Sequence, residues 1–237
     1  MSEPREPALL ALRFLAGFAV LAVAPALVWE ALPQLGVDLA TANAAARLEW
    51  QMLGFVAAAA TVVGLARWQR PAAPWRPFRA ARGLGTYAVV LVPWVLFLVG
   101  YLAAMRRLGH AVPAQPFLDY LAHADAARPG FWVVAVGTCV GAPLAEEVVF
   151  RGYLQGALQE LLPRWPAIAV AAAVFGAVHG IAYTLPIGLL GVVFGALFAR
   201  CGSLWPSALV HAAHNTLTLA ITVFWPRSVD LLYPGGS

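Results

Sequence analysis

The sequence predicts an all-α protein, a polytopic bundle of about seven to eight transmembrane helices. Of its 237 residues, 62% are hydrophobic and only 11% are charged, and the mean hydropathy is +0.77. A soluble domain carries about 25% charged residues. The uncharged runs are long enough to cross a membrane, for which about 17–25 apolar residues suffice. They cover residues 14–29, 50–66, 83–105, 129–145, 165–199 and 201–226.

The run at 165–199 is too long for a single span, and we expect it to break near residues 180–186 into two helices. This gives seven spans, or eight if residues 117–127 also insert. The first run follows Arg5 and Arg13, as in a signal peptide. It continues without a break to Trp29, which favours an uncleaved membrane anchor.

The basic residues predict the orientation of the chain in the membrane. All fifteen are arginine, and five of them lie among aromatic residues between two spans, at positions 67, 70, 76, 79 and 82. This pattern favours a cytoplasmic, lipid-facing loop and an N-terminus inside the cell. Arg106, Arg107 and Arg128 fall on the opposite side and count against that orientation. We expect no nucleic-acid partner.

We expect one membrane domain with two parts. Residues 1–130 form N-terminal transmembrane helices with the cytoplasmic Arg-rich loop and an interfacial linker. Residues 131–226 form a C-terminal catalytic helix bundle. We interpret the linker at 106–129 as a solvated amphipathic loop, with a short interfacial helix or a substrate gate as alternatives.

Two carboxylates and a guanidinium lie inside one of the apolar segments. Glu146, Glu147 and Arg151 are its only charges between residues 129 and 159, and each costs about 2.5–3.5 kcal/mol on insertion scales. Glu147 and Arg151 are four residues apart, which predicts an ion pair on one helix face. Glu146 points about 100° away and lacks that partner. On this segment alone, a structural role for both glutamates and a proton-accepting role for Glu146 are equally open.

Two later helices add histidines to the candidate site. Phe175 precedes His179 by four residues, so its ring can pack on the imidazole, and His211 precedes Asn215 by the same spacing. A lone buried histidine is more often structural than catalytic. Three intramembrane histidines, an asparagine and a free glutamate on three helices indicate a base that works near neutral pH. Two small-xxx-small pairs should allow close helix packing, Gly176 with Gly180 and Gly191 with Gly195.

The three motifs resemble the signature of the CPBP family of intramembrane endopeptidases. These are the CAAX-processing and bacteriocin-related membrane proteases, also called the Abi family. The resemblance covers residues 131–224 and includes Ser203-Leu204-Trp205-Pro206 besides the three motifs, which read Glu146-Glu147-x-x-x-Arg151, Phe175-x-x-x-His179 and His211-x-x-x-Asn215.

The resemblance implies hydrolysis of a peptide bond in a membrane-associated protein or peptide by a glutamate-activated water. Glu146 would be the base and His179 would help to position the water. His211 and Asn215 would stabilise the oxyanion, which is the largest electrostatic task in acyl transfer. The structural support would come from Glu147, Arg151 and Phe175. His214 falls outside the matched pattern and outside the expected catalytic set.

No cofactor is expected, and zinc is kept as an alternative. Glu146, His179 and His211 could hold zinc with one open position, yet no pair has the local spacing of zincins. The resemblance also fits a metal-free glutamate mechanism, which we favour. The expected partners are the lipid bilayer and a membrane-associated substrate, and the expected location is the cell inner (cytoplasmic) membrane, as a multi-pass protein.

The rival interpretation is a non-enzymatic membrane protein, either a proton-coupled transporter or an immunity protein. Buried Glu, His and Arg sets also occur in proton relays. The sequence lacks the paired broken helices of inverted-repeat transporters, which counts against that rival. Solute uptake driven by a pH gradient would favour transport, whereas peptide cleavage in detergent would favour the protease. Prenylated C-terminal peptides, bacteriocin-like precursors and sorting tails all stay open as substrates.

Overall fold

The fold is given by a computed structural model that describes residues 6–35, 43–69, 80–110 and 112–234. Within these ranges the secondary structure is helical and contains no strand, so the predicted all-α class is confirmed. The tip of the Arg-rich loop, with Arg70, Arg76 and Arg79, lies outside the described residues.

A helix lies at every predicted span. The long helices are α1 (Pro7–Ala31), α2 (Ala44–Gln69), α3 (Ala80–Arg107), α8 (Arg164–Ala177), α9 (Thr184–Cys201) and α10 (Leu204–Phe224). The central helix joins α5 (Pro129–Val136), α6 (Ala142–Glu146) and α7 (Gly156–Leu161) through the π-helical segments Gly137–Gly141 and Glu147–Gln155. Two short helices complete the chain, α4 (Pro116–His123) and α11 (Arg227–Leu232).

Several of these helices are long and apolar enough to cross a membrane. Among the described residues, five satisfy both conditions: Pro7–Gln34, Ala44–Trp68, Gly83–Arg107, Pro129–Leu161 and Ile181–Cys201. The other two predicted spans are occupied by α8, which is apolar but only 14 residues long, and by α10, which carries the polar motif with His211. The chain is a multi-pass membrane helix bundle.

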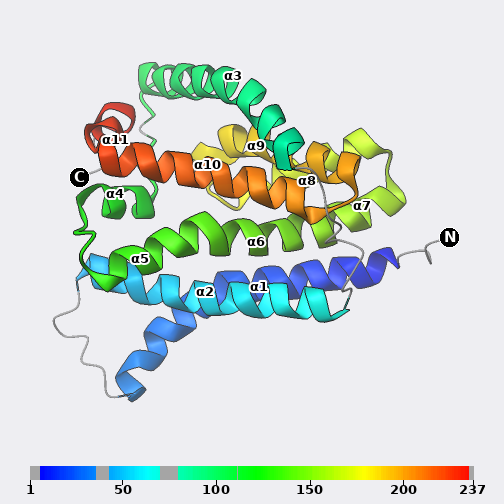
Figure 1. The fold of residues 1–237 in the computed structure, drawn as a ribbon, viewed down its shortest axis with the longest axis horizontal. Coiled ribbons are helices and arrows are strands. Elements are labelled where there is room, and N and C mark those ends of the chain that lie inside the picture. Colours follow the sequence, from blue (N-terminus) through cyan, green and yellow to red (C-terminus); the bar gives the residue numbers. More distant parts are fainter. Residues whose placement is uncertain (1–5, 36–42, 70–79, 111, 235–237) are drawn as a thin grey trace.

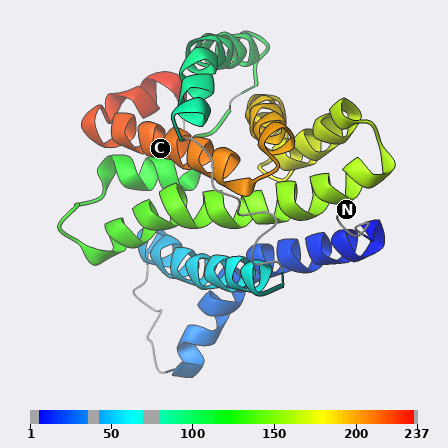
Figure 2. The ribbon, with the colours of Figure 1, turned by 45° about the vertical axis from the view of Figure 1, so that its right-hand side comes forward.

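The helices form layers around the central helix. Figures 1 and 2 show α1 and α2 side by side on one face of the central helix and α10 on the opposite face, with α8 and α9 beside it. The helix α3 is outermost and packs on α9 and α10. Its outer face is apolar, with Val89 76% and Leu96 68% exposed, as expected of a lipid-facing surface. The central helix is thus the best-covered part of the fold, and its motif lies at the centre.

The predicted break between residues 180 and 186 is confirmed. Helix α8 ends at Ala177, a short 3-10 turn covers Ile181–Tyr183, and α9 begins at Thr184. Gly180 has a φ of +102°, which only glycine adopts readily. Gly180 therefore serves the turn and not the helix contact that its spacing from Gly176 predicted, whereas Gly191 packs on Ala172 and Phe175 as expected.

Gly176 lies where α8 and α9 touch, and we expect Gly176→Ala to destabilise the protein. A Cβ at this position would overlap the Thr184 carbonyl oxygen and lie 2.9 Å from the Gly188 nitrogen. Overpacking of this kind costs about 1–3 kcal/mol. Thermal unfolding in detergent measures the effect. The matched control is Gly64→Ala in α2, where no atom lies within 4 Å, so stability should stay equal or rise. Equal stability of the two variants would contradict the tight α8–α9 contact.

A seam of aromatic side chains attaches α3 to the bundle. Tyr87, Trp94 and Tyr101 are seven residues apart and therefore share one face of the helix. Tyr87 Oη lies 3.0 Å from His214 Nδ1, Trp94 Nε1 donates to the Pro186 carbonyl at 3.2 Å, and Tyr101 Oη donates to the Ala182 carbonyl at 2.7 Å. These bonds hold α3 against the start of α9 and the middle of α10.

The linker contains the helix α4, which is too short to be an eighth span. Its eight residues rise about 12 Å. Leu118 and Leu121 are buried, so the segment is more ordered than the solvated loop that its sequence suggested. Tyr120 Oη donates to Glu49 Oε1 of α2 at 2.7 Å. Burial and the Glu49 carboxylate raise the pKa of Tyr120 to about 12, so the phenol keeps its proton and this bond at any physiological pH.

Candidate active site

The two glutamates lie where the hydrogen-bond pattern of the central helix changes. Glu146 is the last residue of α6, and Glu147 begins the π-helical segment that runs to Gln155. Such segments interrupt α-helices frequently at functional sites. The Glu147 side chain is fully buried, whereas that of Glu146 is 17% exposed. Neighbours in sequence therefore occupy different surroundings, one inside the bundle and one at the wall of a cavity.

Glu147 connects an arginine to a histidine inside the bundle. Its Oε2 lies 3.2 Å from Arg151 Nε, which confirms the predicted ion pair, although the two groups lack the alignment of a hydrogen bond. Its Oε1 lies 3.1 Å from Nδ1 of His211. The guanidinium also donates from Nη2 to the Gly191 carbonyl at 3.3 Å. Glu147 therefore positions His211, a contact that the sequence did not predict.

Both histidines of the motifs turn the same nitrogen towards Glu146. Nε2 of His179 lies 4.0 Å, and Nε2 of His211 lies 3.8 Å, from Glu146 Oε2. Nδ1 of His179 is 2.7 Å from the Phe175 carbonyl, and because a carbonyl only accepts, Nδ1 carries a proton. Distances near 4 Å are too long for direct hydrogen bonds but suit a water between the groups. The structure thus brings Glu146, His179 and His211 together.

Asn215 is one turn further along α10, at the same wall. Its Nδ2 donates to the Thr138 carbonyl of the central helix at 2.8 Å. A carboxamide has two amide hydrogens. One of them fixes the orientation of the side chain, and the other is available to a ligand in the cavity.

Two phenylalanines surround the polar groups. The Phe175 ring lies 4.8 Å from the His179 ring and 4.4 Å from the Arg151 guanidinium carbon, so it packs on the imidazole as predicted. Phe194 stacks on His211 at 4.6 Å with an interplanar angle of 19°. This contact of Phe194 was not predicted from the sequence. Its only signal is its place between Gly191 and Gly195, and that spacing does not reveal which ring it meets.

His214 belongs to a different set of contacts. Besides Tyr87, it meets the Trp94 ring edge-on at 4.6 Å. It thus anchors the α3 seam to α10, and no hydrogen bond or ion pair between His214 and Glu146 occurs within the described part of the chain.

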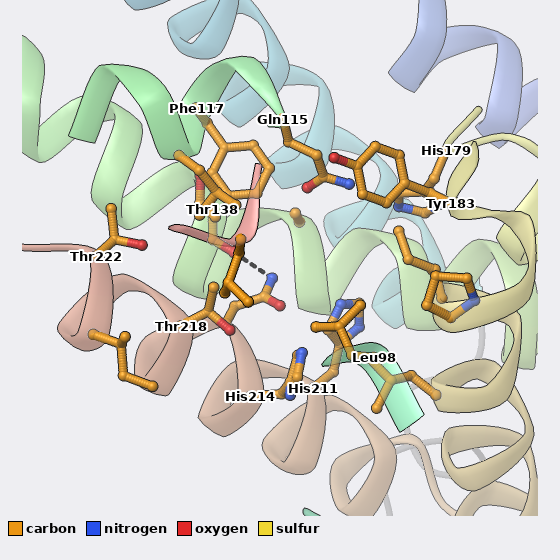
Figure 3. Close-up of a pocket in the computed structure, with 18 of the residues that line it drawn as sticks. Leu98, Gln115, Phe117, Thr138, His179, Tyr183, His211, His214, Thr218 and Thr222 are labelled. Carbon is orange, nitrogen blue, oxygen red and sulfur yellow. Dashed lines mark hydrogen bonds between the residues drawn. The ribbon is translucent and has the colours of Figure 1, made fainter. Parts of the chain in front are cut away.

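One cavity of about 520 Å³ is lined by Glu146, His179, His211 and Asn215. Its volume is common for ligand sites. It is lined by residues of the central helix and of α2, α3, α4, α8, α9, α10 and α11. Figure 3 shows His179 and His211 on one side of it, with Phe117 and Gln115 of the linker region opposite α10. Glu146, His179 and His211 therefore face a mainly apolar cavity that is large enough to hold a segment of a peptide.

Metal binding was the alternative for these donors. Glu146, His179 and His211 face one another. Across the described ranges, however, no three or more His, Cys, Asp or Glu side chains are grouped in a way that could hold a metal ion.

The segment that carries the site is similar to known proteins. Residues 128–217 match the family model described as "Type II CAAX prenyl endopeptidase Rce1-like". A curated relative named "Putative membrane peptidase YdiL", from Bacillus subtilis (strain 168), is 31% identical over 88 residues. This match covers 37% of the chain and 36% of the relative, so the chain spans about a third of the length of that protein. No solved structure matches the chain. The segment from residue 128 to 217, which contains all three motifs, is therefore similar to CAAX-type membrane peptidases.

Proposed function

We propose that the protein is an intramembrane endopeptidase that cleaves a membrane-associated protein or peptide with a water activated by Glu146. The main support for this proposal is that two imidazoles approach Glu146 at the wall of the cavity. Glu146 Oε2 lies 4.0 Å from His179 Nε2 and 3.8 Å from His211 Nε2. A carboxylate beside two imidazoles can hold a water molecule and take its proton.

Each of the four catalytic side chains has its own role in the proposed reaction. Glu146 removes a proton from the water while Nε2 of His179 accepts a second hydrogen bond from it and orients it. The water oxygen attacks the peptide carbonyl carbon, and the developing oxyanion accepts a hydrogen bond from the second amide N–H of Asn215. In its doubly protonated form, His211 donates from Nδ1 to Glu147 and from Nε2 to the oxyanion. Glu146 then delivers its proton to the leaving amine, which closes the cycle with a carboxylate.

The remaining site residues have a supporting role in this proposal. Glu147 and Arg151 fix the position of His211, and Phe175 packs on both His179 and the guanidinium. We place the protein in the cell inner (cytoplasmic) membrane with its N-terminus inside, because the Arg-rich segment between α2 and α3 favours the cytoplasmic side.

The direct test is cleavage by the purified protein in detergent. Membrane peptides from cells lacking the protein are incubated with it, and mass spectrometry identifies new termini. Discrete cleavage sites that depend on intact Glu146 support the proposal. Uptake of solute by proteoliposomes under a pH gradient, without any cleavage, would instead favour the transporter.

Chelation separates the metal-free mechanism from a zinc mechanism. We expect cleavage to continue at an unchanged rate after incubation with 1,10-phenanthroline or EDTA, because Glu146 and the two histidines suffice to activate water. The measurement is the initial rate before and after chelation. Loss of activity that added zinc restores would show that Glu146, His179 and His211 hold a metal after all.

A further inference from the structure

The cavity extends beyond the proposed catalytic groups along a row of threonines. Thr138 of the central helix and Thr218 and Thr222 of α10 all line it. Figure 3 shows the three threonines to one side of His211, away from His179. None of the three hydroxyls takes part in the proposed reaction, in which Thr138 acts only through its carbonyl bond to Asn215. Polar side chains inside a membrane bundle often have a function.

The hydroxyl of Thr138 is buried and unpaired, which is the first indication that the row of threonines binds a ligand. The residue is only 6% exposed, and its hydroxyl has no hydrogen-bond partner among the described residues. Buried polar groups are almost always paired, so an orphan needs an explanation. Thr61 of α2 shows the ordinary solution, because its hydroxyl donates to the Ala57 carbonyl one turn earlier at 2.9 Å. Thr138 lacks such a bond and lines the cavity, but its hydroxyl oxygen is covered, with less than 1 Å² accessible, so it meets a ligand only after rotation about χ1.

The polar residues of α10 are spaced so that they form a continuous row, which is the second indication of a ligand site. His211, Asn215, Thr218 and Thr222 follow one another by four, three and four residues, so they share one face of the helix. From His211 to Thr222 this face is about 16 Å long at 1.5 Å per residue. An extended peptide advances about 3.3 Å per residue, so the face matches roughly five residues.

Much of the remaining cavity lining is apolar. It includes Leu98 and Val99 of α3 and Phe117 and Leu118 of α4, with the polar Gln115 beside Phe117. An extended peptide has backbone amides in its plane and side chains that point to alternate faces. A site with hydroxyls along α10 and mainly apolar side chains around them can hold the backbone along α10 and receive the peptide's side chains among the apolar residues. A hydrocarbon chain would have no use for the hydroxyls.

We propose that Thr138, Thr218 and Thr222 form a stripe that hydrogen-bonds the backbone of an extended substrate peptide, running from Glu146 towards α4 and α11. That this peptide is a substrate rests on the proposed protease function. Each hydroxyl can donate to a peptide carbonyl or accept from a peptide N–H. The stripe therefore binds peptide amides with little regard to sequence and sets the register in which a bond reaches Glu146.

The test measures peptide binding without turnover. In the Glu146→Gln background, a dansyl-labelled pentapeptide of alternating alanine and leucine is titrated into the detergent-solubilised protein, and so is its N-methylated analogue, whose amides cannot donate. Thr218→Val and Thr222→Val should each weaken binding of the unmodified peptide about fivefold, the loss of one neutral hydrogen bond. Where a hydroxyl accepts from a peptide N–H, its valine variant should bind the N-methylated peptide as the parent does; where it donates to a peptide carbonyl, which N-methylation keeps, the loss should persist.

Three controls make the result specific. Thr218→Ser and Thr222→Ser keep the hydroxyl and should bind like the parent, which separates the hydrogen bond from packing. Thr61→Val removes a hydroxyl outside the cavity and should change nothing. Thr138→Val tests the orphan hydroxyl in the same way as the α10 variants.

The outcomes separate this proposal from the protease. If the pentapeptide does not bind, or if the valine variants bind both peptides as the parent does, the stripe is wrong even where the wild-type protein cleaves peptides. If binding depends on the amides and on the threonines but no peptide is ever cleaved, the stripe stands as a peptide-binding site and the proposed protease function fails.

Discussion

Glu146→Gln is expected to abolish peptide cleavage and leave the fold intact. Glutamine has nearly the same shape but cannot accept a proton at the oxygen that faces the two histidines. Loss of a general base lowers the rate by about 10²–10⁴-fold. The Glu146 side chain is 17% exposed, and its histidine contacts at 3.8 and 4.0 Å are too long to hold the bundle together. The thermal unfolding temperature should therefore hardly change.

The measurement is the initial cleavage rate of purified protein beside its unfolding curve in the same detergent. Glu160→Gln provides the matched control, because Glu160 lies on the same central helix at an exposed position in α7. It should cleave at the wild-type rate. Equal turnover by Glu146→Gln and wild type would end the assignment of Glu146 as the base.

The helices of this protein could be predicted because the membrane imposes their length. Apolar runs between charges marked each span, and the glycine at position 180 marked the break between α8 and α9. The π-helical segments Gly137–Gly141 and Glu147–Gln155 could not be predicted, since they depend on how neighbouring helices pack and not on local propensity. The order in α4 likewise comes from burying Leu118 and Leu121 against other helices.

The candidate site shows the same division between local and distant information. Helical periodicity paired Glu147 with Arg151 and Phe175 with His179 correctly, because each pair lies on one helix. The depth and rotation of one helix against another are not encoded in such spacing. For this reason the contact of His211 with Glu147, the bond of Asn215 to Thr138 and the stacking of Phe194 appear only in the structure. The approach of both histidines to Glu146 was expected from the family resemblance alone.

Glu147→Gln should lower stability and activity together, unlike Glu146→Gln. The side chains of Glu147 and Arg151 are 0% and 1% exposed, so the variant leaves the guanidinium charge buried without a counterion. Breaking a buried ion pair in this way costs about 3–5 kcal/mol, which corresponds to a fall on the order of 10 °C in unfolding temperature. Cleavage should drop about tenfold or more, because His211 loses the charged partner that orients its ring.

The double variant Glu147→Gln/Arg151→Gln separates these two effects. Removing both charges relieves the unpaired guanidinium, so most of the lost stability should return. The activity should stay low, because the carboxylate that positions His211 is still missing. If the double variant regains wild-type cleavage together with its stability, Glu147 acts only as a counterion to Arg151. If it stays inactive while stable, the carboxylate has a separate role in holding His211 at the site of the oxyanion.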